Sequence, residues 1–304
     1  QSLTLDHVLM YDNVSYTGTS YALYVRDCEL SVINSTIADN SRGILSFNGD
    51  PSRNETIYMR NTILWGNYDA DGDTNTVETG GSFPLDIDVD FSLLENNSSG
   101  IVGELENMNL LYGQSNVDYN PLFCDSGNGD FQIGDNSVCV GSGENGDNMG
   151  AYDIGCGSVY LPPQITTVSD TSMDEDGELF FWVNAQNYQG YWIYGNASSD
   201  TQSVFVDWNG PEMGPLQIIP MSDWNGVAEI TLVAYCEFDD SVTDTATFSV
   251  TVNPIDDLPY VDGHINPREY PEDFGLDTVV YLPDVFIDID GELTFSYTFS
   301  DTTI

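Results

Sequence analysis

Four segments in the first hundred residues share one pattern of apolar and polar positions. LTLDHVLMYDN, LSVINSTIADN, IYMRNTILWGN and IDVDFSLLENN begin at Leu3, Leu30, Ile57 and Ile87, which lie 27, 27 and 30 residues apart. Each segment alternates apolar and polar residues, which is the pattern of a half-buried β-strand and not of a helix. A unit this short buries its apolar face only by stacking on its neighbours. The repeat therefore predicts a β-solenoid.

An asparagine closes each of the four segments, at Asn13, Asn40, Asn67 and Asn97. Asparagine tolerates the left-handed backbone of a tight turn, and asparagines in stacked turns can hydrogen-bond as a ladder. The column is therefore expected to be structural. A leucine-rich horseshoe is the alternative repeat architecture, but it would need an L-x-x-L-x-L pattern that the chain lacks.

The stretch Asn120–Gly157 separates this repeat from a second kind of sequence. It is rich in glycine and carries apolar residues that could cover the last turn of a solenoid, whose exposed strand edges need protection. Three of the five cysteines, Cys124, Cys139 and Cys156, lie in this stretch and allow three different single disulfides. We expect a closing cap that is held by one of these bonds.

The segment NTILWGN at Asn61, followed by NPLFCDSGNGDFQIGDNSVC and GAYD, resembles the C-terminal end of secreted bacterial right-handed parallel β-helix repeat proteins. The chain departs from that family pattern at Asn120, Val138 and Met149. The resemblance implies a right-handed parallel β-helix over residues 1–160. It implies little about activity, because β-helices serve as lyases, hydrolases, adhesins and stalks alike.

From Pro162 onwards, short alternating strands follow one another with turn signals between them. In VAEITLVAYCEF, every second residue from Ile230 to Phe238 shares one face, which predicts that Cys236 is a buried thiol. The segment MDEDG recurs as YPEDFG 97 residues later, and this spacing is close to the length of a seven-stranded sandwich. The second half is therefore expected to form antiparallel Ig-like β-sandwiches.

The segment VNPIDDLP at Val252–Pro259 resembles the V-N-P-x-N-D-x-P ending of cadherin-like tandem repeats in bacterial surface proteins. That resemblance implies Ca²⁺ held between repeats by an acidic linker, an acidic pair and a D-x-D. The matching residues are Asp256, Asp257, Glu272, Asp273, Asp288 and Asp290. In the preceding repeat Asn187 and Gln189 replace the D-x-D, so the pair Glu175–Asp176 is the weaker candidate.

Another calcium candidate lies between the third and fourth repeats. YDADGDTNTVE places Asp69, Asp71 and Asp73 at alternate positions of a loop, where carboxylate oxygens could converge on a hard cation. The spacing of glycine and glutamate is not that of an EF-hand. The alternative interpretation is a solvated acidic loop.

Charge is the extreme feature of the composition. The chain has 50 acidic residues, 5 arginines and no lysine, for a net charge of −45. Binding to nucleic acid or to an anionic membrane surface is excluded, because both need clustered Lys or Arg. No apolar run approaches the roughly 20 residues of a membrane span. The acidity suits calcium-rich or saline extracellular surroundings, with solubility alone as the alternative explanation.

Catalysis by a β-helix of the pectate-lyase or polygalacturonase type would need carboxylates, or calcium with a basic residue, on one exposed sheet face. The single candidate column consists of Asp6, Ile33, Arg60 and Asp90. A salt bridge between Arg60 and Asp90 is the simpler interpretation. His7 and His264 fall in different predicted domains, so no histidine relay is expected. We predict that this chain carries no catalytic residues.

These patterns predict an all-β chain in three parts. A right-handed parallel β-helix with its cap would occupy residues 1–160, and an Ig-like or cadherin-like sandwich residues 161–258. Residues 259–304 would form the first half of a second sandwich. Because half a sandwich exposes apolar strands, its missing strands are expected from a continuing chain or from a partner.

The expected function is a structural or adhesive role outside the cell or on a bacterial cell surface, with Ca²⁺ stiffening the chain. Carbohydrate and other surface proteins are the candidate partners, together with further copies of the chain in a fibre. One alternative is the non-catalytic end of a polysaccharide lyase or hydrolase whose active strands lie outside this segment. Another is a filament subunit that assembles by strand donation.

Overall fold

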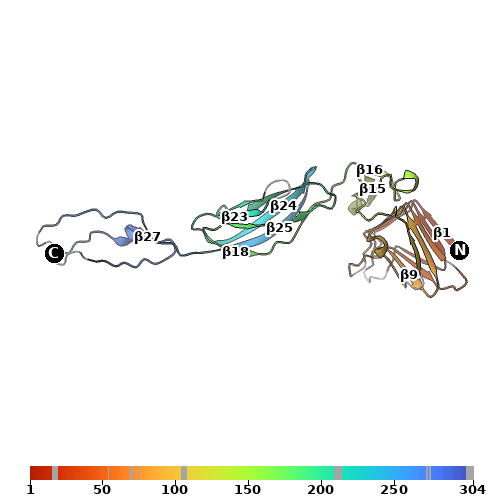
Figure 1. Cartoon of the computed structure of the whole chain (residues 1–304), viewed down its shortest axis with the longest axis horizontal. Helices are drawn as coiled ribbons and strands as arrows, with labels where there is room; N and C mark the ends of the chain where they lie inside the picture. The colour runs from red at the N-terminus through yellow and green to blue at the C-terminus, as the bar shows by residue number, and fades with distance from the viewer. Residues whose placement is uncertain are drawn as a thin grey trace. The chain divides into compact units, whose positions relative to one another are not determined.

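The computed structural model describes residues 1–15, 20–53, 55–68, 71–74, 76–103, 108–208, 214–271, 273 and 275–298. The chain divides into two compact units, Gln1–Val159 and Tyr160–Ile304, called here the N-terminal and C-terminal units (Figure 1). Both units are built from β-strands, and the expectation of an all-β fold is confirmed.

Helix is almost absent from the residues that the structure describes. It is limited to the short 3₁₀ turns η1 (Asn97–Gly100), η3 (Ser126–Asn128), η4 (Glu144–Gly146) and η5 (Leu282–Asp284). In this part of the chain, none of the helices has the length and apolar character needed to cross a membrane.

Three parallel sheets make up most of the N-terminal unit. Sheet A contains β1 (Ser2–Asp6), β4 (Glu29–Ile33), β7 (Glu55–Arg60), β10 (Leu85–Asp90) and β13 (Met108–Tyr112). Sheet B contains β2 (Leu9–Tyr11), β5 (Thr36–Ala38), β8 (Ile63–Trp65) and β11 (Leu93–Leu94). Sheet C contains β3 (Leu23–Arg26), β6 (Ile44–Asn48), β9 (Val77–Gly81) and β12 (Ile101–Val102). Successive strands join sheets A, B and C in turn, so each repeat pairs with the next one in parallel.

The apolar columns of the sequence coincide with the register of sheet A. Leu3 pairs with Leu30, Leu30 with Ile57, and Ile57 with Ile87. These side chains enter one core together with inward residues of sheets B and C. A shift of one residue would turn every one of them to the opposite face, so the alternation itself specifies the pairing.

The asparagine column forms a ladder over three repeats. Asn13 donates its Nδ2 hydrogen to Asn40 Oδ1 at 2.8 Å, and Asn40 donates to Asn67 Oδ1 at 2.9 Å. Asn40 and Asn67 are buried. The fourth predicted member, Asn97, lies outside the ladder because η1 begins there, and its amide donates to Asp118 Oδ2 instead. The structural interpretation therefore holds for three of the four positions.

Residues 120–157 cover the outer face of sheet B. Ile63 of β8 and Leu93 of β11 pack against Ile133, Cys139 and Met149 of this segment. Phe131 lies 4.9 Å from the ring of Tyr11 in β2, and Ala151 N–H donates to Thr36 Oγ1 in β5 at 2.9 Å. These contacts extend over all four strands of sheet B. The prediction of a cap on the last turn was wrong in position, because the segment packs on outward-facing residues of sheet B such as Ile63 and Leu93.

One disulfide holds this covering segment. Its strands β14 (Phe123–Asp125), β15 (Asp130–Gly134) and β16 (Ile154–Cys156) form a small sheet, and Cys124 is bonded to Cys156. Cys139 is a free, buried thiol whose pKa is raised by burial to about 12. Of the three pairings that the sequence left open, the structure therefore has Cys124–Cys156.

Glu55 is a carboxylate inside the N-terminal unit. Only 1% of the residue is exposed, and neither carboxylate oxygen has a hydrogen-bond partner among the described residues. Burial, followed by repulsion from Asp27, raises the pKa of this carboxyl. The folded state therefore holds the proton more tightly than the unfolded state, so stability falls as the pH rises from about 4.5 through the folded pKa.

We expect Glu55→Gln to stabilise the chain at pH 7 by about 1 kcal/mol, because the amide is buried without a charge. The gain should disappear near about pH 3, where Glu55 is protonated in both states. Thermal unfolding at the two pH values measures this difference, and Glu29→Gln, at an exposed position of β4, is the matched control. An equal gain at both pH values would contradict the role of the buried charge.

The C-terminal unit is mainly antiparallel. Its four-stranded sheet contains β18 (Thr171–Asp174), β25 (Asp239–Asn253), β24 (Gly226–Cys236) and β21 (Ile193–Ser199). Its three-stranded sheet contains β19 (Leu179–Phe181), β23 (Leu216–Pro220) and β22 (Val204–Asp207). Two smaller sheets pair β17 (Gln164–Ile165) with β20 (Ala185–Gln186), and β26 (Tyr260–Val261) with β27 (Phe286–Ile287). Among the described strands of this unit, β18 is the exception to antiparallel pairing, because it runs parallel to β25.

The two larger sheets of this unit contribute to one core. Val204 and Ile218 from the three-stranded sheet pack with Ile230 and Phe248 from the four-stranded sheet. Cys236 is buried as the alternation predicted. The same pattern placed Phe238 in the core, and this was wrong. Strand β24 ends at Cys236 and the chain turns, so the Phe238 side chain is 56% exposed.

Candidate metal centre

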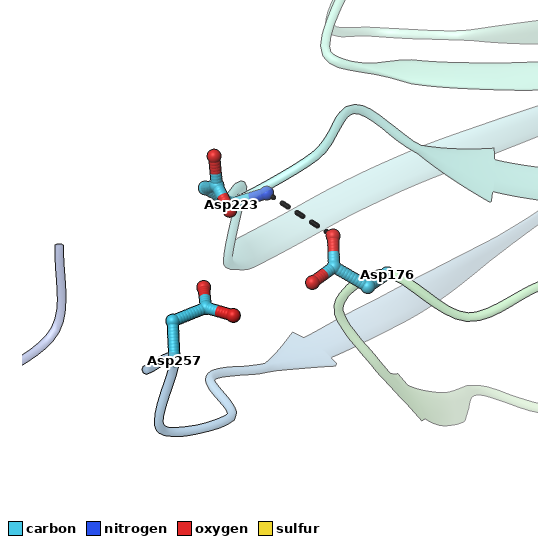
Figure 2. A group of neighbouring side chains, drawn as sticks. All are labelled: Asp176, Asp223 and Asp257. Atoms are coloured by element: carbon cyan, nitrogen blue, oxygen red, sulfur yellow. Dashed lines mark hydrogen bonds between the residues drawn. The ribbon is translucent and has the colours of Figure 1, made fainter. Parts of the chain in front are cut away.

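Three carboxylates converge at one end of the C-terminal unit. One oxygen from each of Asp176, Asp223 and Asp257 lies within 4.8 Å of the other two. Figure 2 shows each side chain turning an oxygen towards the same space, and Asp223 N–H donating to Asp176 Oδ1 at 3.4 Å. This is the one group of three or more potential ligands within the described ranges.

The strand directions explain why these three residues meet. Asp176 lies in the turn that follows β18, and Asp257 lies in the segment that follows β25. Because β18 and β25 are parallel, both exits are at the same end of the sheet. Asp223 lies in the turn before β24, which is antiparallel to β25 and therefore starts at that end. Asp176 and Asp223 both have left-handed backbone, with φ of 60° and 59°, a conformation that aspartate tolerates well.

Glu175 anchors the exit of β25 beside this group. Glu175 N–H donates to Asn253 O at 2.9 Å, and Ile255 N–H donates to Glu175 Oε1 at 2.6 Å. The residue is 1% exposed, and its second oxygen, Oε2, has no hydrogen-bond partner among the described residues. The carboxylate thus fixes the backbone that leads to Asp257 and retains one buried oxygen without a donor.

The Asp257 carboxylate is repelled by the neighbouring carboxylates of the group. Burial, followed by the carboxylates of Asp176, Asp223 and Asp290, raises the pKa of Asp257. Its Oδ2 atom is buried and has no hydrogen-bond partner in the described part of the chain. Asp257 N–H donates to Asp290 Oδ2 at 3.1 Å, which brings a fourth carboxylate to the group. A bound cation would offset the repulsion between these carboxylates and would give the buried Oδ2 of Asp257 a partner.

The donor set fits a hard divalent cation, and Ca²⁺ best. Calcium binds carboxylate oxygens at about 2.3–2.6 Å, so oxygens on opposite sides of the ion are about 5 Å apart. Three oxygens within 4.8 Å of one another satisfy that limit. Magnesium needs shorter distances and a near-ideal octahedron, while zinc favours nitrogen and sulfur ligands, which are missing from this group.

The structure brings together only part of the predicted calcium ligands. Asp257 lies in the group and Asp290 beside it, whereas Asp256 is exposed and is not part of the group. Asp288 accepts hydrogen bonds from Gly291 N–H at 2.8 Å and Asp290 N–H at 3.2 Å, as in a turn. Asp273 is exposed and has left-handed backbone.

Two of the predicted ligands, Asp69 and Glu272, lie outside the described residues. Asp71 and Asp73 lie in the loop between β8 and β9 and belong to no group of three potential ligands among the described residues. The calcium prediction for that loop stays a prediction.

No protein-family model and no curated protein matches the chain. The assignment of the centre therefore rests on its geometry alone.

The sequence ranked Glu175–Asp176 as the weaker site and did not single out Asp223 as a ligand. The order and direction of the predicted strands could have identified these residues. Turns that precede or follow neighbouring strands at one end of a sheet meet there, whatever their distance in sequence. MDEDG, DWNG and PIDD are the acidic turns that the fold places at this end.

The structure shows the contacts of Arg60 and Asp90 in the candidate catalytic column of sheet A. Arg60 pairs with Asp90 in the strand register, but its guanidinium binds Asp88 Oδ1 at 2.9 Å and lies 4.2 Å from the centre of the Tyr58 ring. Asp90 instead accepts hydrogen bonds from Phe91 N–H and Ser115 N–H. The contact between Arg60 and Asp88 joins neighbouring strands of sheet A. That the chain carries no catalytic residues stays a prediction.

Proposed function

We propose that this chain is a structural or adhesive segment of an extracellular protein, with Ca²⁺ bound by Asp176, Asp223 and Asp257. The observation that carries the proposal is the convergence of the three carboxylates around the buried, unpartnered Oδ2 of Asp257. The Cys124–Cys156 disulfide supports an oxidising compartment such as the bacterial cell surface. The net charge of −45 supports surroundings rich in cations.

The architecture that we infer for this role is a right-handed parallel β-helix followed by Ig-like, cadherin-like domains. The cyclic order of strands in sheets A, B and C, with repeats paired in parallel, supports the β-helix. Two sheets around one core support the sandwich in the C-terminal unit. A calcium ion would tie the segment that leaves β25 to two turns of the preceding domain, and Asp290 is close enough to Asp257 to contribute a ligand.

Calcium removal is the test of this function. In excess Ca²⁺ the C-terminal unit should unfold at a higher temperature than in EDTA, with a gain of about 2.7 kcal/mol when Ca²⁺ is 100 times its dissociation constant. Calorimetry of the full chain measures the shift. Asp257→Asn should abolish most of it, because a ligand and a negative charge are lost.

Asp256→Asn is the matched control, since it removes the same charge from the neighbouring exposed position, which is not part of the group. This variant should keep the calcium response. A melting temperature that is the same in Ca²⁺ and in EDTA would refute the proposal, and so would an equal loss of response in the two variants.

A further inference from the structure

A groove of about 460 Å³ opens beside the core of the C-terminal unit. It lies between two stretches of chain, residues 182–185 and residues 190–193. The first stretch leads from β19 into β20, which pairs with β17. The second leads into β21, which pairs with β24. The two stretches lead into strands of different sheets. They are therefore not hydrogen-bonded to each other as neighbouring strands, and a space is left between them.

The floor of the groove is apolar and its rims are aromatic. Val183, Ala185 and Ile193 line it and also pack in the core of the unit. Trp182 comes from the first stretch and is 69% exposed, while Trp192 comes from the second and is 50% exposed. Neither indole ring makes a ring-to-ring contact within the described part of the chain, so their faces stay available to a ligand.

A third aromatic residue supports the groove from within. Tyr191 packs against Tyr160 at 5.4 Å and against Phe238 at 5.1 Å between ring centres. These contacts hold the stretch that carries Trp192, and Gly190, with φ of 77°, permits the tight turn that precedes it. The groove is therefore built by packed residues and is not a gap between loose loops.

Three side chains at the groove have hydrogen-bonding groups without a partner among the described residues. The Asn184 side-chain amide is exposed and has no partner in the described residues, and the same is true of the indole N–H groups of Trp182 and Trp192. Broad π-faces next to free amide and indole donors match a pyranose ring, which presents C–H groups on its faces and hydroxyl groups at its edge.

The charges of the groove and of the whole chain favour a neutral ligand over an anionic one. None of the residues that line the groove is ionisable except Tyr191, so the groove has no cation to pair with a carboxylate or sulfate. The chain as a whole has a net charge of −45, which repels anionic polysaccharides. A quaternary ammonium ligand would be attracted by that charge, but it favours a cage of several rings, and here Tyr191 is already engaged by Tyr160 and Phe238.

We propose that the groove between Trp182 and Trp192 binds a neutral oligosaccharide. The sugar rings stack on the two indoles, and Asn184 hydrogen-bonds to their hydroxyl groups. This site is separate from the calcium centre and needs none of its residues. It would give the chain an adhesive contact of its own.

The test is titration of the full chain with neutral hexasaccharides: cellohexaose, laminarihexaose, mannohexaose and N-acetylchitohexaose. Tryptophan fluorescence and isothermal titration calorimetry should detect saturable binding of at least one of them. Trp182→Ala and Trp192→Ala should each weaken that binding about tenfold or more. Because both side chains are at least half exposed, these variants should keep the melting temperature of the parent.

Phe205→Ala is the matched control, because Phe205 is 58% exposed on the same unit and does not line the groove. It should bind the sugar as the parent does. EDTA should leave the affinity unchanged, which separates this site from the calcium proposal. Failure of all four sugars to bind would overturn the inference, as would tighter binding of hexagalacturonate or tetramethylammonium chloride, or an equal loss of affinity in Phe205→Ala.

Discussion

Replacing Asn40 with alanine should lower the free energy of unfolding by about 4 kcal/mol. The Asn40 amide donates to Met10 O at 3.1 Å and to Ala38 O at 2.9 Å. It also donates to Asn67 Oδ1 at 2.9 Å, and its own Oδ1 accepts from Asn13 N–H at 3.1 Å. Alanine would remove all of these side-chain hydrogen bonds. Those to Ala38 O and Asn67 Oδ1 lie in the buried interior, where a group that loses its partner costs about 1–3 kcal/mol.

Asn13→Ala is the control for this experiment. Asn13 is the exposed end of the same ladder, where water can replace the lost hydrogen bonds, so its loss should be about 1 kcal/mol or less. Urea unfolding followed by far-UV circular dichroism gives both values. If Asn40→Ala is no more destabilising than Asn13→Ala, the ladder is not a structural element of the N-terminal unit.

Loss of the Cys124–Cys156 disulfide should destabilise the N-terminal unit by about 3–4 kcal/mol. The two cysteines are 32 residues apart, and the bond limits the freedom of that loop in the unfolded chain. The double variant Cys124→Ser/Cys156→Ser should therefore unfold at a lower urea concentration. The outer face of sheet B should then become more accessible to hydrogen exchange, because the covering segment is held less firmly.

Thiol counting provides an independent check of the pairing. In denaturant without reductant, three of the five cysteines should react, namely Cys28, Cys139 and Cys236. Cys28→Ser, at a half-exposed position, is the control and should leave the stability unchanged within about 0.5 kcal/mol. Five reactive thiols would show that the bond does not form, and a disulfide to Cys139 would show that the pairing is different.

The strand pairing of the N-terminal unit could be predicted because its signal is local and repeated. Leu3, Leu30 and Ile57 recur at one interval, and only a parallel register puts them in one core column. The same holds for Asn13, Asn40 and Asn67, whose side chains bond to the equivalent residue one repeat away. In a repeated sequence the contacts between units can be predicted, because each residue packs against the equivalent residue of the next repeat.

The surface that residues 120–157 cover could not be predicted from the repeat. Glycine and aromatic residues in Asn120–Gly157 indicated that it covers apolar surface, but several surfaces were available. The choice depends on outward residues such as Ile63 and Leu93, which form one face only when four repeats are already stacked. The same long-range packing brings Cys124 next to Cys156 and leaves Cys139 as a buried free thiol.

Alternation, register and the asparagine ladder follow from the sequence, because each of them depends on neighbours in the chain or on the next copy of a repeat. The disulfide pair, the surface under residues 120–157 and the carboxylates of the metal centre required the folded chain. Asp176, Asp223 and Asp257 are 47 and 34 residues apart in sequence, and none of the three turns has a metal-binding spacing of its own. They meet because the ends of β18, β24 and β25 lie at the same end of one sheet, and strand direction is a property of the whole sheet.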